Sequence, residues 1–146
     1  MHVGGIGTGL LLRQRKGRKL LTGPQTVAAA NFFAKYPMQP RNPGTGNNLA
    51  QQLQAWIGGP SDSGKEAYVL ITNLGPDLGA SGFSQQLYGA QKVTVSLEDL
   101  GIAGSTWRFT DVWAGNSSKV TASYTAYLTE GASQLLHLTS CSGKKR

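Results

Sequence analysis

Cysteine, charged residues and long apolar runs are all scarce in this sequence, and each scarcity excludes a class of protein. The single cysteine, Cys141, has no partner within the chain, so no internal disulfide can form. Charged residues are only 14% of the chain, whereas helical bundles are usually rich in Glu and Lys. No stretch approaches the roughly 18 consecutive apolar residues of a membrane-spanning helix, so we expect no membrane partner.

Metal ligands are scarce too. The two histidines, His2 and His137, lie at opposite ends of the chain, without the closely spaced partners that a zinc site requires. His137 stands among leucines, which is typical of a strand residue. We therefore expect no metal and no cofactor.

The net charge of +7 is concentrated at the ends of the chain. Residues 1–50 contain seven basic residues and no acidic one, and the last three residues are all basic. Residues 51–140 contain four basic and seven acidic residues, a net charge of 4 − 7 = −3. This distribution argues against nucleic acid as the main partner. The basic run Arg13–Lys19 still leaves one alternative open, a nucleic-acid or nuclear interaction protein acting through the leader.

The two ends of the chain have the composition of irregular segments. Met1–Gly9 is rich in glycine, and Tyr36–Asn48 contains three prolines and two glycines. We therefore expect a basic, disordered or irregular leader over residues 1–50 and a basic tail over residues 141–146. No signal peptide is recognisable, because the positive charge follows the short apolar patch instead of preceding it. The localisation is left open.

From residue 51 onward, short alternating or β-branched segments follow one another, separated by turn signals. Their spacing is typical of an antiparallel sandwich or barrel, and no helical period interrupts them. The sequence therefore predicts one all-β domain over residues 51–140. The six predicted strands are Gln52–Ile57, Glu66–Asn73, Gln91–Leu97, Thr106–Val112, Val120–Leu128 and Gln134–Thr139.

No catalytic residue stands out, but a few residues are candidates for contacts or modification. Glycosidases generally need two carboxylates across the scissile bond, and nothing sets any pair of the seven acids apart. Trp56 and Trp107 lie inside predicted strands, which favours core packing, whereas Trp113 lies at a strand end and is the better candidate for an exposed or interface aromatic. Trp113 or Trp56 would be the sugar contact if the chain were a free-standing carbohydrate-binding module. Asn116 begins an N-glycosylation triplet in a predicted turn.

Four blocks of the sequence together resemble one family. Ala55–Gly75, Lys92–Ile102, Phe109–Gly115 and Tyr124–Thr139 are similar, in this order, to the C-terminal domain of glycoside hydrolase family 27 α-galactosidases, particularly fungal ones. The shared elements are a W-x-G-P-like opening, a strand that ends in Asn, a D-L-G turn and a D-V-W element.

The resemblance implies a Greek-key-like β-sandwich that packs on a catalytic (β/α)₈ barrel. The parent activity would be the hydrolysis of terminal α-galactosides by enzymes that are usually secreted. The family's catalytic aspartates belong to the barrel, whose motifs are absent from this chain. We therefore expect an accessory domain that is not catalytic alone, with a catalytic barrel or carbohydrate as its partner.

Overall fold

The structure, a computed structural model, describes residues 21–41, 55–73 and 89–141. Within these ranges no helix is long and apolar enough to cross a membrane. The elements within the described ranges are, in chain order, α3 (Pro24–Lys35), β1 (Gln39–Arg41), β2 (Ala55–Gly58), β3 (Glu66–Thr72), β4 (Gln91–Ser96), β5 (Trp107–Asp111), β6 (Ser117–Val120), β7 (Ser123–Leu128) and β8 (Ser133–Ser140).

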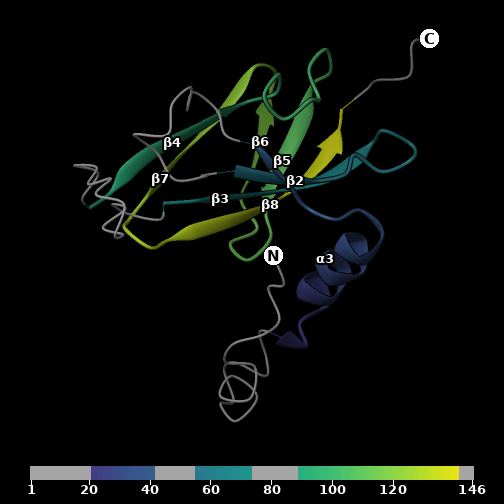
Figure 1. Ribbon diagram of the computed structural model, residues 1–146, viewed down its shortest axis with the longest axis horizontal. Helices are drawn as coiled ribbons and strands as arrows, with labels where there is room; N and C mark the ends of the chain where they lie inside the picture. The colour runs from purple at the N-terminus through teal and green to yellow at the C-terminus, as the bar shows by residue number, and fades with distance from the viewer. Residues whose placement is uncertain (1–20, 42–54, 74–88, 142–146) are drawn as a thin grey trace, which may run out of the picture.

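The strands form two stacked antiparallel sheets (Figure 1). The larger sheet has six strands in the order β1-β2-β3-β8-β5-β6, and the smaller sheet consists of β4 and β7. Neighbours in the larger sheet come from distant parts of the chain, since β3 and β8 pair along their length from Glu66↔Thr139 to Thr72↔Ser133. The all-β, antiparallel sandwich predicted from the sequence is confirmed.

The core between the sheets is made by side chains that alternate along the strands. Val93 and Val95 of β4 are fully buried, whereas Lys92 and Thr94 between them are exposed. Phe109 of β5 and Leu136 of β8 belong to the same buried cluster. Burying one such side chain contributes about 1.5–3 kcal/mol, so the alternation determines which face of each strand turns inward.

One predicted strand is two strands in the structure. Val120–Leu128 is interrupted after Val120, so that β6 pairs with β5 in the larger sheet and β7 pairs with β4 in the smaller one. Val120 is buried, but the three residues after it are exposed, which breaks the inward–outward alternation. The chain passes from the larger sheet to the smaller one at this break.

The structure corrects the expected irregular leader for residues 21–41. Proline in its first turn favours the start of α3, and the helix ends just before Pro37, which disfavours helical geometry in the preceding residue. Strand β1 then pairs with β2. The remaining residues of the leader, 1–20 and 42–50, lie outside the described residues, as does the tail over residues 142–146.

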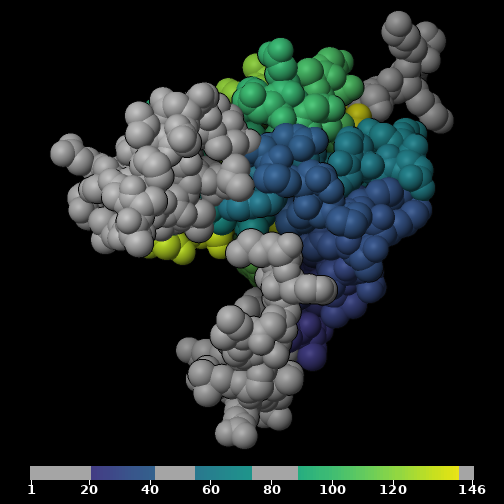
Figure 2. All heavy atoms as spheres, in the orientation of Figure 1, coloured from purple at the N-terminus to yellow at the C-terminus, as the bar shows by residue number. Residues whose placement is uncertain are grey.

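Helix α3 covers the outer face of the larger sheet, on the side away from β4 and β7 (Figure 1). The ring of Phe32 lies 5.0 Å from that of Tyr68, and the Phe33 ring lies 5.4 Å from it. A Cβ atom on Gly58 would lie only 2.9 Å from Phe33 Cδ1, so glycine at this position permits the close approach of the helix. Figure 2 shows the blue atoms of this segment packed directly beside the teal atoms of β2 and β3.

Candidate functional site

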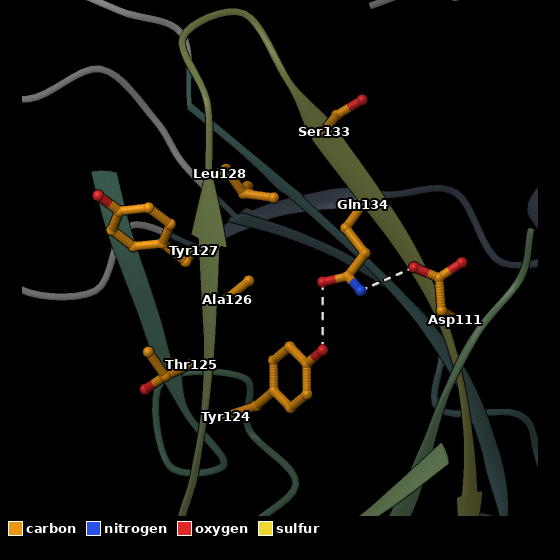
Figure 3. A pocket seen from close by; sticks show the side chains of 8 residues that line it. All are labelled: Asp111, Tyr124, Thr125, Ala126, Tyr127, Leu128, Ser133 and Gln134. Carbon is orange, nitrogen blue, oxygen red and sulfur yellow. Dashed lines mark hydrogen bonds between the residues drawn. The ribbon is translucent and has the colours of Figure 1, made fainter. Parts of the chain in front are cut away.

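A shallow groove of about 370 Å³ lies between β7 and β8. Five consecutive residues of β7 form one wall, and Asp111 of β5 closes the end of the groove (Figure 3). The lining residues are Asp111, Tyr124, Thr125, Ala126, Tyr127, Leu128, Ser133 and Gln134. The site is therefore an open, mostly polar groove along one strand and not an enclosed pocket.

Three polar side chains form a chain of hydrogen bonds across the groove (Figure 3). The Tyr124 hydroxyl donates to Gln134 Oε1 at 3.2 Å, and Gln134 Nε2 donates to Asp111 Oδ2 at 2.7 Å. The Tyr124 ring stacks on Phe109, with 5.2 Å between the ring centres. Burial of the Tyr124 hydroxyl, aided by the nearby Asp111 charge, raises its pKa despite the hydrogen bond with Gln134. The phenol therefore stays neutral and acts as a hydrogen-bond donor.

Asp111 also organises the turn that follows β5. Its Oδ1 accepts hydrogen bonds from the backbone N–H groups of Trp113 at 2.9 Å and Ala114 at 2.6 Å. Burial alone would raise the pKa of Asp111, but the hydrogen bonds from Ala114, Gln134 and Trp113 outweigh it, and the pKa is lowered. The carboxylate is thus ionised at neutral pH while it is partly buried.

The three tryptophans have three different environments. Trp107 is buried in the core, where its indole N–H donates to the Ile102 carbonyl at 3.0 Å, as its strand position predicted. Trp56 is only half-buried and belongs to neither buried cluster, so the expected core packing does not hold for it. Trp113 is 52% exposed on the turn that Asp111 organises, and it does not line the groove.

Asn116 lies in the connection between β5 and β6 and is exposed, as are Ser117 and Ser118 after it. Its backbone carbonyl accepts a hydrogen bond from the Asp111 N–H at 2.8 Å, which closes the turn. The side chain of the N-glycosylation triplet is therefore accessible on a well-formed turn.

Two other described carboxylates, Glu66 and Asp62, have structural contacts outside the groove. Glu66 lies 2.8 Å from His137 Nε2 on the outer face, where the His137 ring stacks on Tyr68. Asp62 binds Lys35 at 2.8 Å, and this ion pair lowers the pKa of the carboxyl. Within residues 21–41, 55–73 and 89–141, no group of three His, Cys, Asp or Glu side chains is arranged to hold a metal ion.

Sequence reasoning missed the role of two polar residues. In the sequence, Asp111 is one of seven acids of which none stands out, and Gln134 is only the first residue of a predicted strand. Their contact joins residues 23 positions apart, which no local pattern reveals. The only usable signal was the D-V-W element, because an acidic residue followed by exposed turn residues is typical of a side chain that caps its own turn.

The fold defines the chain as an antiparallel two-sheet β-sandwich, and Asp111 is the one carboxylate among the described residues that line its groove. The family model for the "alpha galactosidase C-terminal beta sandwich domain" matches residues 50–138. The chain belongs to this family, and the resemblance read from its four blocks is confirmed.

Two fungal relatives extend this match. "Alpha-galactosidase 3" of Hypocrea jecorina is 72% identical over 122 residues, which are 84% of this chain and 19% of the relative. A relative from Emericella nidulans is 54% identical over 101 residues, 69% of this chain and 20% of its own length. The chain thus spans about a fifth of the length of these curated relatives. Because 146 − 122 = 24 residues remain outside the first match, that match includes part of residues 1–50.

The solved structure of α-galactosidase I from Mortierella vinacea has a similar fold. The TM-score is 0.61 at 13% identity, and the similarity covers 86% of this chain and 28% of that one. At this identity the comparison supports the sandwich fold alone.

Proposed function

We propose that this chain is the accessory, non-catalytic β-sandwich of an α-galactosidase-type glycoside hydrolase, which cleaves terminal α-galactosides. Its partner would be a catalytic (β/α)₈ barrel. The observation that carries the proposal is that Asp111 is the single carboxylate among the described residues that line the groove, because hydrolysis of a glycosidic bond by the usual mechanisms needs two acidic groups about 5–10 Å apart. Asp111, the one present, already binds two backbone N–H groups and the Gln134 amide.

The first test is the activity of the purified chain on 4-nitrophenyl α-galactoside. We expect no release of nitrophenol above the rate in buffer. Turnover by the chain that disappears in the Asp111→Asn variant would contradict the proposal. Glu66→Gln is the matched control, because that carboxylate contacts His137 on the opposite face of the larger sheet.

The second test joins the chain to the rest of a related α-galactosidase. The segment of the Hypocrea jecorina relative that is 72% identical is replaced by the corresponding residues of this chain. We expect a folded chimera whose activity on 4-nitrophenyl α-galactoside is close to that of the relative and unchanged by Asp111→Asn. A chimera that folds but shows no activity would argue against an accessory role in this type of enzyme.

A second candidate function is carbohydrate binding through Trp113. This residue is 52% exposed, and the hydrogen bonds of Asp111 hold its turn in one conformation, as a stacking platform for a sugar ring requires. Calorimetric titration with galacto-oligosaccharides tests it. Saturable binding that is lost in Trp113→Ala but kept in Trp56→Ala would support a sugar contact, and no heat of binding by the folded chain would exclude one.

Asn116 is our candidate for N-glycosylation, because the whole Asn-Ser-Ser triplet is exposed. Production in a secreting eukaryotic host should add a glycan that peptide N-glycosidase removes and that Asn116→Gln never acquires. An unmodified secreted chain would contradict this assignment.

A further inference from the structure

We propose that the groove beside β7 is a binding site for an extended polypeptide strand that carries lysine or arginine. Such a strand would pair with the edge of β7 and become the third strand of the smaller sheet. This inference does not depend on the proposed function, because it rests on the backbone of β7, on the groove beside it and on the charge of Asp111.

Among the described residues, no strand pairs with the groove side of β7. The Leu97 N–H donates to the Ala122 carbonyl at 2.8 Å, one step beyond the register pair Ser96↔Ser123. In an antiparallel ladder the bonded pairs alternate, so residues 124, 126 and 128 turn their backbone groups toward β4. Ser123, Thr125 and Tyr127 then turn theirs toward the open edge, where no described strand pairs with them.

β7 also lacks the residues that protect sheet edges from pairing with other chains. Proline or a cation within an edge strand discourages such pairing. Each of the other three edge strands contains one: β1 has Pro40 and Arg41, β6 has Lys119, and β4 has Lys92. β7, with the sequence Ser-Tyr-Thr-Ala-Tyr-Leu, has neither. Its edge therefore remains competent for strand addition.

The side chains in the groove favour a cation in the added strand. Asp111 is ionised, and no described cation lies within ion-pair distance of it. Its three hydrogen bonds leave one carboxylate lone pair available, since a carboxylate has about four acceptor sites. A lysine or arginine on the inward face of the strand can use that site. The other lining groups, among them Ser133 and Gln134, are polar and suit a hydrated backbone.

The groove suits one strand better than a second copy of the domain. In Figure 3, Ser133 and Gln134 of β8 and Asp111 of β5 lie beside β7 and belong to the larger sheet. Antiparallel pairing of two β7 edges would place both larger sheets on the same side of the joined sheet, so that these strands would compete for the same space. A single extended segment brings no second large sheet with it, and within the part of the chain that the structure describes it meets no such obstacle.

Fluorescence anisotropy of a labelled peptide tests the proposal on the full chain. The probe alternates threonine and lysine and has six residues, the length of β7. A peptide of alternating threonine and glutamate is its control. Because residues 51–140 carry a net charge of −3, general attraction to the sandwich would also favour the lysine peptide. Saturable binding of the lysine peptide that is weakened in Asp111→Asn would therefore support a local acidic site.

Two proline variants separate edge pairing from other modes of binding. Thr125→Pro removes an N–H that faces the open edge of β7, and Thr94→Pro removes its counterpart on the outer edge of β4, so neither breaks the β4–β7 ladder. We expect Thr125→Pro to weaken binding by about tenfold or more and Thr94→Pro to leave it unchanged. Asp111→Asn should weaken binding of the lysine peptide without affecting a neutral threonine peptide.

Several results would overturn the proposal. The first two are a folded wild-type chain that does not bind the lysine peptide saturably, and a Thr125→Pro variant that binds it as tightly as wild type. The other two are displacement of the peptide by galacto-oligosaccharides, and a dimer in sedimentation that Thr125→Pro abolishes. If Thr125→Pro fails to fold, hydrogen exchange on the wild-type chain decides the matter. The proposal requires the Thr125 and Tyr127 amides to gain protection when the lysine peptide binds.

Discussion

The buried side chain of Asn73 links the two sheets by hydrogen bonds, and its replacement tests how much this link stabilises the fold. It follows β3 in the larger sheet and is 1% exposed. Its Nδ2 donates to the carbonyl of Gly89, just before β4, at 2.9 Å and to that of Leu128, at the end of β7, at 3.0 Å. Its backbone N–H and carbonyl bind Ala132 and Gly131. One amide group thus joins the larger sheet to both strands of the smaller one.

The expected cost of removing this amide follows from the carbonyls that it leaves behind. Asn73→Ala removes one hydrogen bond from each of two carbonyl groups, and a single hydrogen bond contributes about 0.5–1.5 kcal/mol net. The Gly89 carbonyl is only partly buried and regains water, so we expect a total loss of about 1–3 kcal/mol in the free energy of unfolding. Asn73→Asp keeps the volume but points carboxylate oxygens at the two carbonyls. It should destabilise at least as much as alanine.

The neighbouring residue provides a matched control. Thr72 is 6% exposed, and its hydroxyl has no hydrogen-bond partner in the described part of the chain. Thr72→Val removes that unsatisfied hydroxyl with little change of shape, so its effect should be neutral or stabilising. A loss as large as that of Asn73→Ala would show that any change at this position disrupts packing.

Urea denaturation followed by tryptophan fluorescence, to which the buried Trp107 contributes, measures all three variants. For Asn73→Ala the melting temperature should fall by roughly 5–15 °C. The reasoning is refuted if Asn73→Ala lies within about 0.5 kcal/mol of wild type, or if Asn73→Asp is clearly more stable than Asn73→Ala. Either result would mean that the amide donors do not hold the sheets together.

Three further predictions concern other parts of the fold. The pKa of Asp111 is lowered in the folded state, so its stabilisation is present above its unfolded pKa of about 3.9 and is lost as the pH falls through the folded value. The difference in melting temperature between wild type and Asp111→Asn should therefore shrink between about pH 7 and about pH 3, and a constant difference would speak against an ionised role. Gly58→Ala should cost about 1–3 kcal/mol by displacing Phe33, and less in a Phe33→Ala background; strict additivity in a double-mutant cycle would exclude this contact. Asn116→Gln should remove the glycan. Because the side chain is exposed, the free energy of unfolding of the unglycosylated chain should change by no more than about 0.5 kcal/mol.

Strand positions could be predicted well where burial alternates locally. Val93 and Val95 are buried and Lys92 and Thr94 exposed, as the period of two required. The prediction failed where one segment serves two sheets, because the interruption after Val120 leaves no proline or glycine to mark it. It also failed for α3, whose alanines and phenylalanines have a weak period and are held in place by Tyr68.

Only part of the candidate site could be predicted from the sequence. Exposure of Trp113 followed from its place after a strand, and the structure places it on an exposed turn. The network of Asp111, Gln134 and Tyr124 could not be foreseen, because each of these residues follows the ordinary pattern of its own strand. They meet only because β5 and β8 pair and β7 crosses over them.

By itself, the sequence determined the composition, the absence of an internal disulfide, the inward and outward faces of most strands and the family. These properties depend on single residues or on neighbours along the chain, which a linear pattern records. Only the tertiary structure decided the order of the strands, the helix on the outer face, the bridging amide of Asn73 and the open edge of β7. Each of these joins residues tens of positions apart, as from Asn73 to Leu128, and the free energy of such contacts depends on three-dimensional packing.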